Sequence, residues 1–242
     1  MYLTRFRINT QRRDARRLLS SPHLMHGAVN AAFPQLPPRG VPGPRVLWRV
    51  DHEPSGRALL YVTSPSRPDL THLVEQAGWP AAEGPGWDSF PYGDFLGALA
   101  AGDSWGFRLT ANPVHAVRLS EDRTVRTKRL AHVTARQQLG WLLKRQKANG
   151  FEVLRKPEER RLPGVDEGYE VMLRDRLPLK FRRPTGAKGD VQFTRVTYDG
   201  RLRVTNVDLL RRALTQGLGK AKAYGCGLMT LAPVNGATEK AA

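Results

Sequence analysis

The sequence has very little cysteine: Cys226 is the single one among 242 residues. The chain can therefore form no intramolecular disulfide and no cysteine-based zinc site, and Cys226 is expected to be a small buried residue. No uninterrupted apolar run approaches the length of a membrane span. The first residues alternate like a strand and lack the apolar core of a signal peptide. These absences predict a soluble protein of the cytoplasm.

Recognised ligand spacings are also missing. His52, His72, His115 and His132 are scattered along the chain, and neither a D-x-D nor an H-x-x-x-H pattern occurs. We therefore expect no catalytic metal and no other cofactor. The order G-x-x-x-x-G-K-[ST] of a nucleotide-binding P-loop is absent too, so the chain's glycine-rich segment calls for another explanation.

Acidic residues are scarce relative to basic ones. Lys and Arg number 39 against 22 Asp and Glu, which gives a formal charge of +17 and a pI near 10.8. The excess is uneven, because residues 1–115 carry a net charge of +3 and residues 116–242 carry +14. Such a balance favours a polyanionic partner, nucleic acid above all, bound mainly by the second half of the chain.

The most informative segment that is present is Gly217–Gly227 (GLGKAKAYGCG), between a helical pattern and the apolar run Leu228–Ala232. Glycine lets backbone N–H groups approach a ligand, and lysine adds positive charge, so the segment suits a phosphate backbone. A plain helix C-cap followed by a turn explains the glycines equally well. The predicted phosphate-binding residues are Gly217, Gly219, Lys220, Lys222 and Gly225.

Two histidines are the candidates for catalysis. Ser21-Pro22 predicts the start of a helix, with serine as the N-cap and proline at the first position. On that helix His23, His26, Gly27 and Asn30 fall within an arc of roughly 100°, opposite an apolar face. They are either surface histidines or acid–base groups, since imidazole titrates near neutrality, as RNA cleavage by the RNA's own 2′-hydroxyl requires.

A basic segment in the last third of the chain is interrupted by proline and glycine. It is predicted to be a loop or a twisted ribbon that contacts RNA, with a solvated charged surface as the alternative. The helix bearing Lys144, Arg145 and Lys147 is the rival RNA-binding surface. The cations of the basic segment are Arg174, Arg176, Lys180, Arg182, Arg183 and Lys188.

The order of predicted elements indicates an α+β fold of two tandem ferredoxin-like βαββαβ domains. The first covers residues 1–115, with Trp105–Asn112 as its closing strand and residues 79–94 as an irregular connection. The second covers 120–234, with Arg123–Leu130 as the candidate first strand. Asp199-Gly200 is predicted to be the turn of a hairpin. Residues 235–242 are expected to form a disordered tail.

These features together resemble the CasE family, the CRISPR RNA-processing endoribonucleases of type I-E systems. The segments that carry the resemblance are Met1–Thr4, Met25-His26, Phe107–Pro113 (FRLTANP), Trp141-Leu142 and Gly217–Leu228. They span nearly the whole chain in order, and the glycine-rich segment is the most specific of them.

The resemblance implies two ferredoxin-like domains and a metal-independent nuclease that cuts repeat-derived RNA at the 3′ base of a hairpin. It implies a 2′,3′-cyclic phosphate on the product, which stays bound within a multisubunit surveillance complex. His26 matches the family's catalytic histidine, while His23 stands where some relatives have tyrosine. Phe181–Arg183 matches the segment that contacts the RNA stem. The alternative is a non-catalytic subunit that binds an RNA hairpin on the same scaffold.

Overall fold

The structure, a computed structural model, describes residues 1–38, 40–53, 55–80, 84–117, 128–161, 168–182 and 190–234. Two compact units divide the chain. One comprises Met1–Leu99 with Arg211–Leu228, and the other Ala100–Leu210 with the segment that begins at Met229. Within the described ranges, no helix combines the length and the apolar character needed to cross a membrane.

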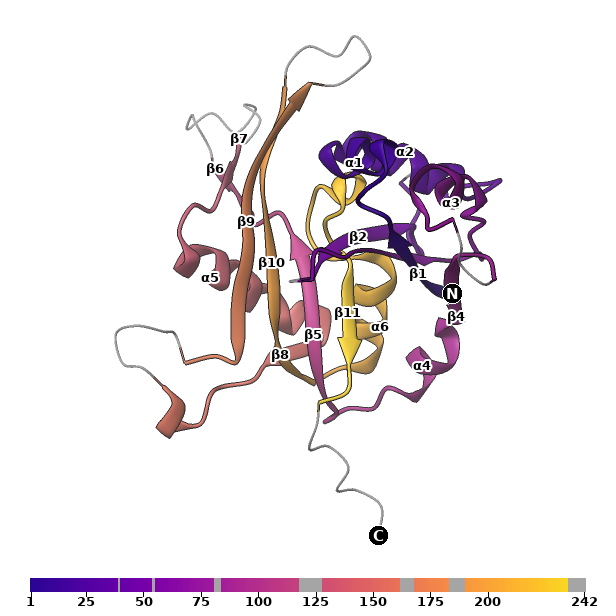
Figure 1. Ribbon diagram of the computed structural model, residues 1–242. Helices are drawn as coiled ribbons and strands as arrows, with labels where there is room; N and C mark the ends of the chain where they lie inside the picture. The colour runs from indigo at the N-terminus through magenta and orange to yellow at the C-terminus, as the bar shows by residue number, and fades with distance from the viewer. Residues whose placement is uncertain are drawn as a thin grey trace. The chain divides into compact units, whose positions relative to one another are not determined.

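The first unit is a four-stranded antiparallel sheet in the order β2-β3-β1-β4, with helices α1, α2 and α3 on one face (Figure 1). This is the strand order of a ferredoxin-like βαββαβ fold. Its elements are β1 (Tyr2–Ile8), α1 (Arg13–Ser20), α2 (Pro22–Ala31), β2 (Leu47–His52), β3 (Ala58–Ser64), α3 (Thr71–Ala77), β4 (Trp87–Pro91) and α4 (Tyr92–Ala98).

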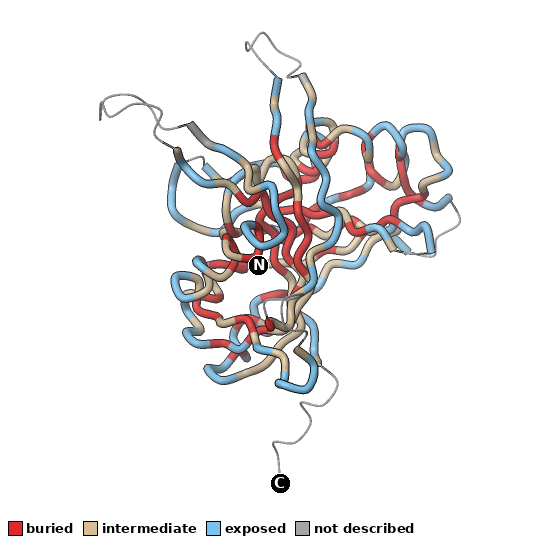
Figure 2. Tube along the Cα trace, turned by 90° about the vertical axis from the view of Figure 1, so that its left-hand side faces the viewer, coloured by how far each residue is buried: buried red, intermediate tan, exposed pale blue. Residues whose placement is uncertain are grey.

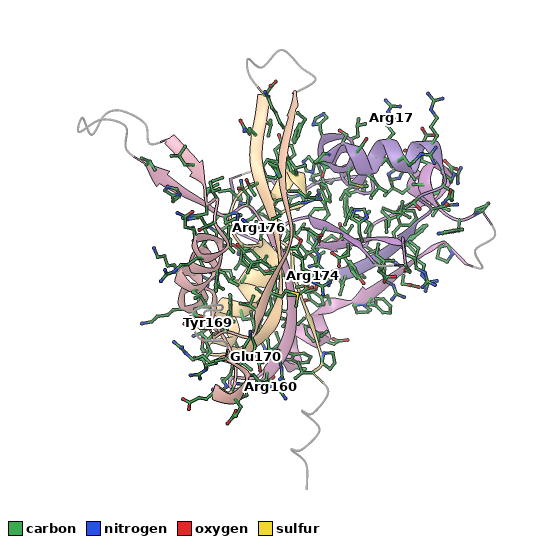
Figure 3. The ribbon with its side chains drawn as sticks, turned by 60° about the vertical axis from the view of Figure 1, so that its left-hand side comes forward. Arg17, Arg160, Tyr169, Glu170, Arg174 and Arg176 are labelled. Carbon is green, nitrogen blue, oxygen red and sulfur yellow. The ribbon has the colours of Figure 1, made fainter. Side chains whose placement is uncertain are left out.

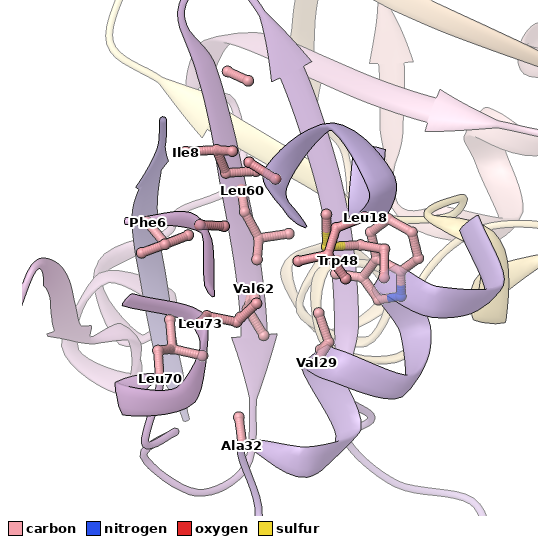
Figure 4. Packing of buried hydrophobic residues seen from close by; sticks show 14 of the residues in the cluster. Phe6, Ile8, Leu18, Val29, Ala32, Trp48, Leu60, Val62, Leu70 and Leu73 are labelled. Carbon is pink, nitrogen blue, oxygen red and sulfur yellow. The ribbon is translucent and has the colours of Figure 1, made fainter. Parts of the chain in front are cut away.

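The core of this unit lies between the sheet and those helices. Phe6, Leu60 and Val62 are at most 1% exposed and face residues such as Val29 and Leu73 from the helices (Figure 4). Alternate strand residues supply this face, as the period of a β-strand requires. Each such side chain contributes about 1.5–3 kcal/mol on burial, which holds α2 firmly on the sheet.

The second unit has the same strand order, β11-β5-β10-β8, with β9 paired to β10. Its elements are β5 (Ser104–Ala111), β6 (Val114–Val117), β7 (Lys128–Ala131), α5 (Ala135–Gln146), η1 (Lys147–Asn149), β8 (Phe151–Val153), η2 (Glu158–Arg160), β9 (Val171–Arg182), β10 (Asp190–Val204) and β11 (Met229–Ala232). Helix α6 (Val207–Gln216) contains the boundary between the units, and η3 (Lys222–Tyr224) belongs to the first. The predicted pair of ferredoxin-like folds is confirmed.

Two predicted strands were wrongly placed. Trp105–Asn112 does not close the first sheet, because β5 pairs with β10 and β11 in the second unit. The strand that closes the first sheet is β4, which pairs with β1 inside the stretch 79–94 that was expected to be irregular. Strand β4 is short and largely exposed, so it carries no alternating apolar signal. The division into domains 1–115 and 120–234 stays a prediction.

Strand β5 also takes the place of the predicted first strand of the second unit. Part of Arg123–Leu130 lies outside the described residues, and Lys128–Ala131 forms β7, which pairs with β6 in a separate hairpin. The predicted turn at Asp199-Gly200 is wrong as well, since both residues continue strand β10. Gly200 is required there for another reason: a Cβ would lie 2.5 Å from the carbonyl oxygen of Glu170.

The long ribbon of the second unit is formed by β9 and β10, which run side by side (Figure 1). The pairing shifts register between Arg195 and Thr197, and Asp175 adopts a positive φ of 47° on the opposite strand. Such irregularities increase the local twist of a ribbon. Buried residues gather on the strands of each unit, whereas β9 is mostly exposed (Figure 2). The predicted disordered tail lies outside the described residues.

Candidate active site

Helix α2 positions the candidate catalytic histidine. The side chain of Ser21 accepts a hydrogen bond from the Leu24 backbone N–H at 3.3 Å, and Pro22 occupies the first turn, as the sequence predicts. Met25 and Val29 are buried on the opposite face. The helix therefore has a fixed start and a fixed rotation, and these leave His26 half-buried at the edge of the core.

His26 has a partner on each side of its ring. The Trp48 indole N–H donates to Nδ1 at 3.4 Å, and the Asn30 side-chain amide lies 3.3 Å from Nε2. An indole can only donate, so Nδ1 accepts and a neutral ring carries its proton on Nε2. Asn30 Nδ2 is the atom beside Nε2, and a flip of this amide, whose nitrogen and oxygen are assigned from the hydrogen-bond network, would present its oxygen to that proton. These bonds fix the orientation of the imidazole.

Trp48 is itself immobilised. It is 2% exposed and lies beside Leu18 in the core (Figure 4). Its ring edge faces Gly225 of the glycine-rich loop, where a Cβ would lie 2.7 Å from the indole Cζ3. Gly225 has φ 76°, so glycine serves both the close approach and the backbone conformation. The loop, the indole and His26 are therefore in one continuous contact.

The glycine-rich loop is closed at its neck. Gly217 ends α6 with φ 75°, and the Leu218 N–H donates to the Gly227 carbonyl at 2.9 Å. Leu218, Cys226 and Leu228 are buried, while Lys220 is exposed. The segment is thus a helix C-cap and also a structured loop. Its short helix η3 packs against α2, the helix that carries His26.

A buried ion pair anchors the far end of the loop. Arg49 of β2 is 2% exposed, and its Nε donates to the Asp51 carboxylate at 2.7 Å. The same guanidinium donates from Nη1 to the Leu228 carbonyl at 3.2 Å. A buried guanidinium needs such full pairing, so removal of either partner would leave an uncompensated charge. Arg49 therefore ties the loop to the strand that bears Trp48.

Lys222 is the one predicted phosphate-binding residue with a clearly perturbed pKa in the described loop. Its side chain is half-buried, and burial lowers its pKa to about 8, with further lowering by the positive charges of Arg45 and Lys220. Burial and neighbouring positive charges both disfavour the charged form of this lysine, and a bound phosphate would offset that cost. Lys220 and Lys222 of the loop, together with Arg45 of the preceding part of the chain, make this region a candidate phosphate site.

The structure separates His23 from His26. His23 is exposed and lines a groove between α1, α2 and α3, of which His26 is not a part. Residues three apart on a helix share a side but still differ by about 60° in direction. The pair predicted on one arc is therefore divided between two surroundings, and only His26 contacts Trp48.

The basic segment lies on β9 of the second unit, and Figure 3 shows Arg174 and Arg176 along the ribbon. Arg174 is 3.5 Å from Asp199, and Lys180 is 3.4 Å from Asp190. Arg176 donates to the Val133 carbonyl at 2.8 Å. These cations are thus partly engaged within the protein. The side chain of Arg182, and Arg183 and Lys188 altogether, lie outside the described residues.

The class of this protein is defined by two features. The chain has two ferredoxin-like units, and a glycine-rich loop packs on the helix that carries His26. A model of the CRISPR-associated protein family matches residues 1–233. The CRISPR-associated endoribonuclease Cse3 of Thermus thermophilus is 31% identical over 239 residues, which are 96% of this chain and 100% of that protein. The chain belongs to the CRISPR-associated protein family and is an endoribonuclease.

Solved structures agree with this assignment. Thermus thermophilus Cse3 bound to an RNA representing a pre-cleavage complex is similar with a TM-score of 0.72 and 30% identity, over 96% of this chain and 98% of that one. Cas6e from Escherichia coli str. K-12 shares the fold at 21% identity, with a TM-score of 0.60 over 97% of this chain and 100% of that one.

Three residues of the site escaped the sequence analysis. The strand that contains Trp48 and Arg49 has a sequence pattern that indicates only burial. Arg45 lies next to a proline-rich stretch. Trp48 contacts His26, and Arg49 contacts Leu228 as well as the nearby Asp51. Local patterns carry no signal for the contacts with His26 and Leu228, because these partners are distant in the chain. The apolar residues on both sides of Arg49 were the available clue, because they indicate burial and a buried arginine requires partners.

Proposed function

We propose that this protein is a metal-independent endoribonuclease that cleaves CRISPR precursor RNA at the 3′ base of the repeat hairpin. The observation that carries the proposal is the fixed imidazole of His26 beside a loop with two lysines, Lys220 and Lys222. It is supported by 31% identity to an endoribonuclease over nearly the whole chain.

The chemistry is a transesterification within the RNA. The 2′-hydroxyl loses its proton, and its oxygen attacks the adjacent phosphorus. The bond from phosphorus to the 5′-oxygen breaks, and that oxygen takes up a proton. The products are a 2′,3′-cyclic phosphate and a 5′-hydroxyl. His26 exchanges one of these protons through Nε2, because Trp48 occupies Nδ1. Asn30 gives way to the substrate at Nε2.

The loop stabilises the charge that develops on the phosphorane. Lys222 and Lys220 supply positive charge, and the backbone N–H groups around Gly217, Gly219 and Gly225 supply donors. Preorganised donors of this kind are usually a large term in catalysis, since they need not reorganise during the reaction. The second candidate from the sequence, His23, is assigned an auxiliary role because it lies outside the contact network of His26.

The hairpin stem is bound by the ribbon of β9 and β10, with Arg176, Lys180, Arg182, Arg183 and Lys188 toward the phosphates. The net charge of +14 over residues 116–242 supports this placement. The cleaved RNA stays bound, and the enzyme remains with it in a type I-E surveillance complex in the cytoplasm. A nuclease that keeps its product turns over once, whatever the speed of its chemical step.

The rival is a non-catalytic subunit that binds the hairpin on the same scaffold. Incubation of the protein with a repeat hairpin RNA in EDTA separates the two. Site-specific cleavage supports the enzyme, whereas tight binding without cleavage supports the rival. Binding that ignores the hairpin would contradict both and would indicate attraction by charge alone.

A further inference from the structure

A groove on the first unit is lined in part by α2, the helix that carries His26, and apart from His23 its residues have no role in the proposed reaction. It has a volume of about 390 Å³ and opens between α1, α2 and α3. Small-molecule sites typically have about 300–1,000 Å³, so a single nucleotide fits, whereas a duplex does not. The groove is lined by Asp14, Arg17, Leu18, His23, Leu24, Gly27, Ala28, Ala31, His72 and Gln76.

Its lining combines an apolar floor with a polar rim. Leu18, Leu24 and Ala28 supply apolar surface, while the rim can form hydrogen bonds and stack. His72 is held in place, because its Nε2–H donates to the Ala28 carbonyl at 2.8 Å. An imidazole ring, like other aromatic rings, can stack on an unpaired base, and carboxylate and amide groups read base edges.

The rim is also basic on the side of α1. Arg13, Arg16 and Arg17 are exposed on this helix, and Asp14 is its only acidic residue. Arg17 projects from α1 and lines the groove (Figure 3). The first half of the chain has a net charge of only +3, so this gathering of arginines is local. A guanidinium at the mouth of a base-sized groove suits the phosphate of a bound nucleotide.

The groove adjoins the reaction site through α2. Gly27 follows His26 directly and lines the groove, and a Cβ at Gly27 would meet nothing within 4 Å. His23 also lines the groove and lies three residues before His26, about 4.5 Å away along the helix axis. A strand whose phosphate lies at His26 can therefore pass over Gly27 and place its next nucleotide beside His23.

We propose that this groove binds one unpaired nucleotide of the substrate strand next to the scissile phosphate, with its base beside His23 and its phosphate on Arg17. The inference rests on the proposed function and deepens it, because it gives the arginines of α1 and His23 a role in substrate recognition. It assigns His23 a function in the groove, separate from the contact between Trp48 and His26.

The test measures binding of two hairpin RNAs that carry a 2′-deoxy nucleotide at the cut and so cannot react. The short RNA ends one nucleotide beyond the stem, and the extended RNA carries four unpaired nucleotides there. The extension is placed on the 3′ side in one experiment and on the 5′ side in another. The variants are Arg17→Ala with His23→Ala, and Gly27→Leu, which fills the groove without loss of charge. Arg57→Ala, an exposed arginine directly before β3, controls for loss of one charge.

The extended RNA should bind the wild-type protein more tightly than the short one, and both groove variants should lose about 5- to 100-fold in affinity for it, as expected for one stacked base. Affinity for the short RNA should change little. The arm that responds identifies the side of the cut. Equal losses for both RNAs, or none for either, would overturn the subsite. If an RNA with a ribose at the cut is not cleaved, that result contradicts the proposed function instead. The affinity measurement tests the subsite whether or not cleavage occurs.

Discussion

At the scale of single residues, the contact between Trp48 and His26 is the feature on which the proposed chemistry depends most. Trp48→Phe keeps an aromatic ring but removes the N–H that donates to Nδ1 at 3.4 Å. We expect the single-turnover cleavage rate to fall about 10-fold, less than a lost acid–base group would cost. RNA affinity should change little. Trp141→Phe is the matched control, since Trp141 is equally buried and its indole N–H has no partner among the described residues. Equal rates in both variants would contradict a positioning role for Trp48.

Lys222 gives the site a dependence on pH with a definite sign. Burial and nearby positive charges lower its pKa to about 8, so the charged form declines as the pH rises through 8. Hairpin affinity should therefore weaken between pH 7 and 9, by about 3- to 10-fold, as expected for one charge-assisted contact. Lys222→Arg, which stays charged, should abolish this decline.

The free protein should respond to the same pH change in the opposite direction. The unfolded chain, whose lysine has an ordinary pKa, binds more protons than the folded protein above pH 8, so the free energy of unfolding should rise there. Titration of affinity by fluorescence anisotropy and chemical unfolding at each pH measure the two effects. An affinity that declines equally in Lys222→Arg would assign the pH dependence to another group.

At the scale of elements, the ribbon of β9 and β10 is the proposed stem-binding surface. Replacement of Arg182 and Arg183 by alanine should weaken hairpin binding. It should also flatten the salt dependence, because each lost phosphate contact on a duplex removes roughly 0.9 from the slope of log affinity against log salt. Cleavage of saturating RNA should fall less than affinity. If the slope is unchanged, the ribbon does not bind the stem, and the helix with Lys144, Arg145 and Lys147 becomes the candidate stem-binding surface.

The elements also show where sequence patterns inform and where they fail. The start of α2 follows from Ser21-Pro22, a local cap that needs no partner. Strand β4 has no such local signal, because its pairing with β1 rather than an apolar pattern makes it a strand. The predicted turn at Gly200 is wrong for a related reason. In β10 this glycine permits the close approach of Glu170, and a sequence alone does not distinguish such a glycine from one in a turn.

At the scale of the whole molecule, the fold class could be predicted because the order of helices and strands survives errors in single strands. The wrong assignment of β5 to the first sheet left the predicted type of both folds unchanged. The candidate site was predictable in part. His26 and the glycine-rich loop have local signatures, whereas Trp48 and Arg49 act through contacts across the chain. Whole-chain similarity to an endoribonuclease then supplies the class of reaction that composition leaves open.

The most direct test of the account is single-turnover cleavage of an end-labelled repeat hairpin RNA in EDTA by the wild-type protein and His26→Ala, with the product ends identified. We predict a cut at the 3′ base of the hairpin, a 2′,3′-cyclic phosphate and a 5′-hydroxyl. We predict a rate loss of about 10²–10⁴-fold in His26→Ala, with hairpin affinity within a few-fold of wild type. Near-normal cleavage by His26→Ala, or a product with a 3′-hydroxyl and a 5′-phosphate, would contradict the account.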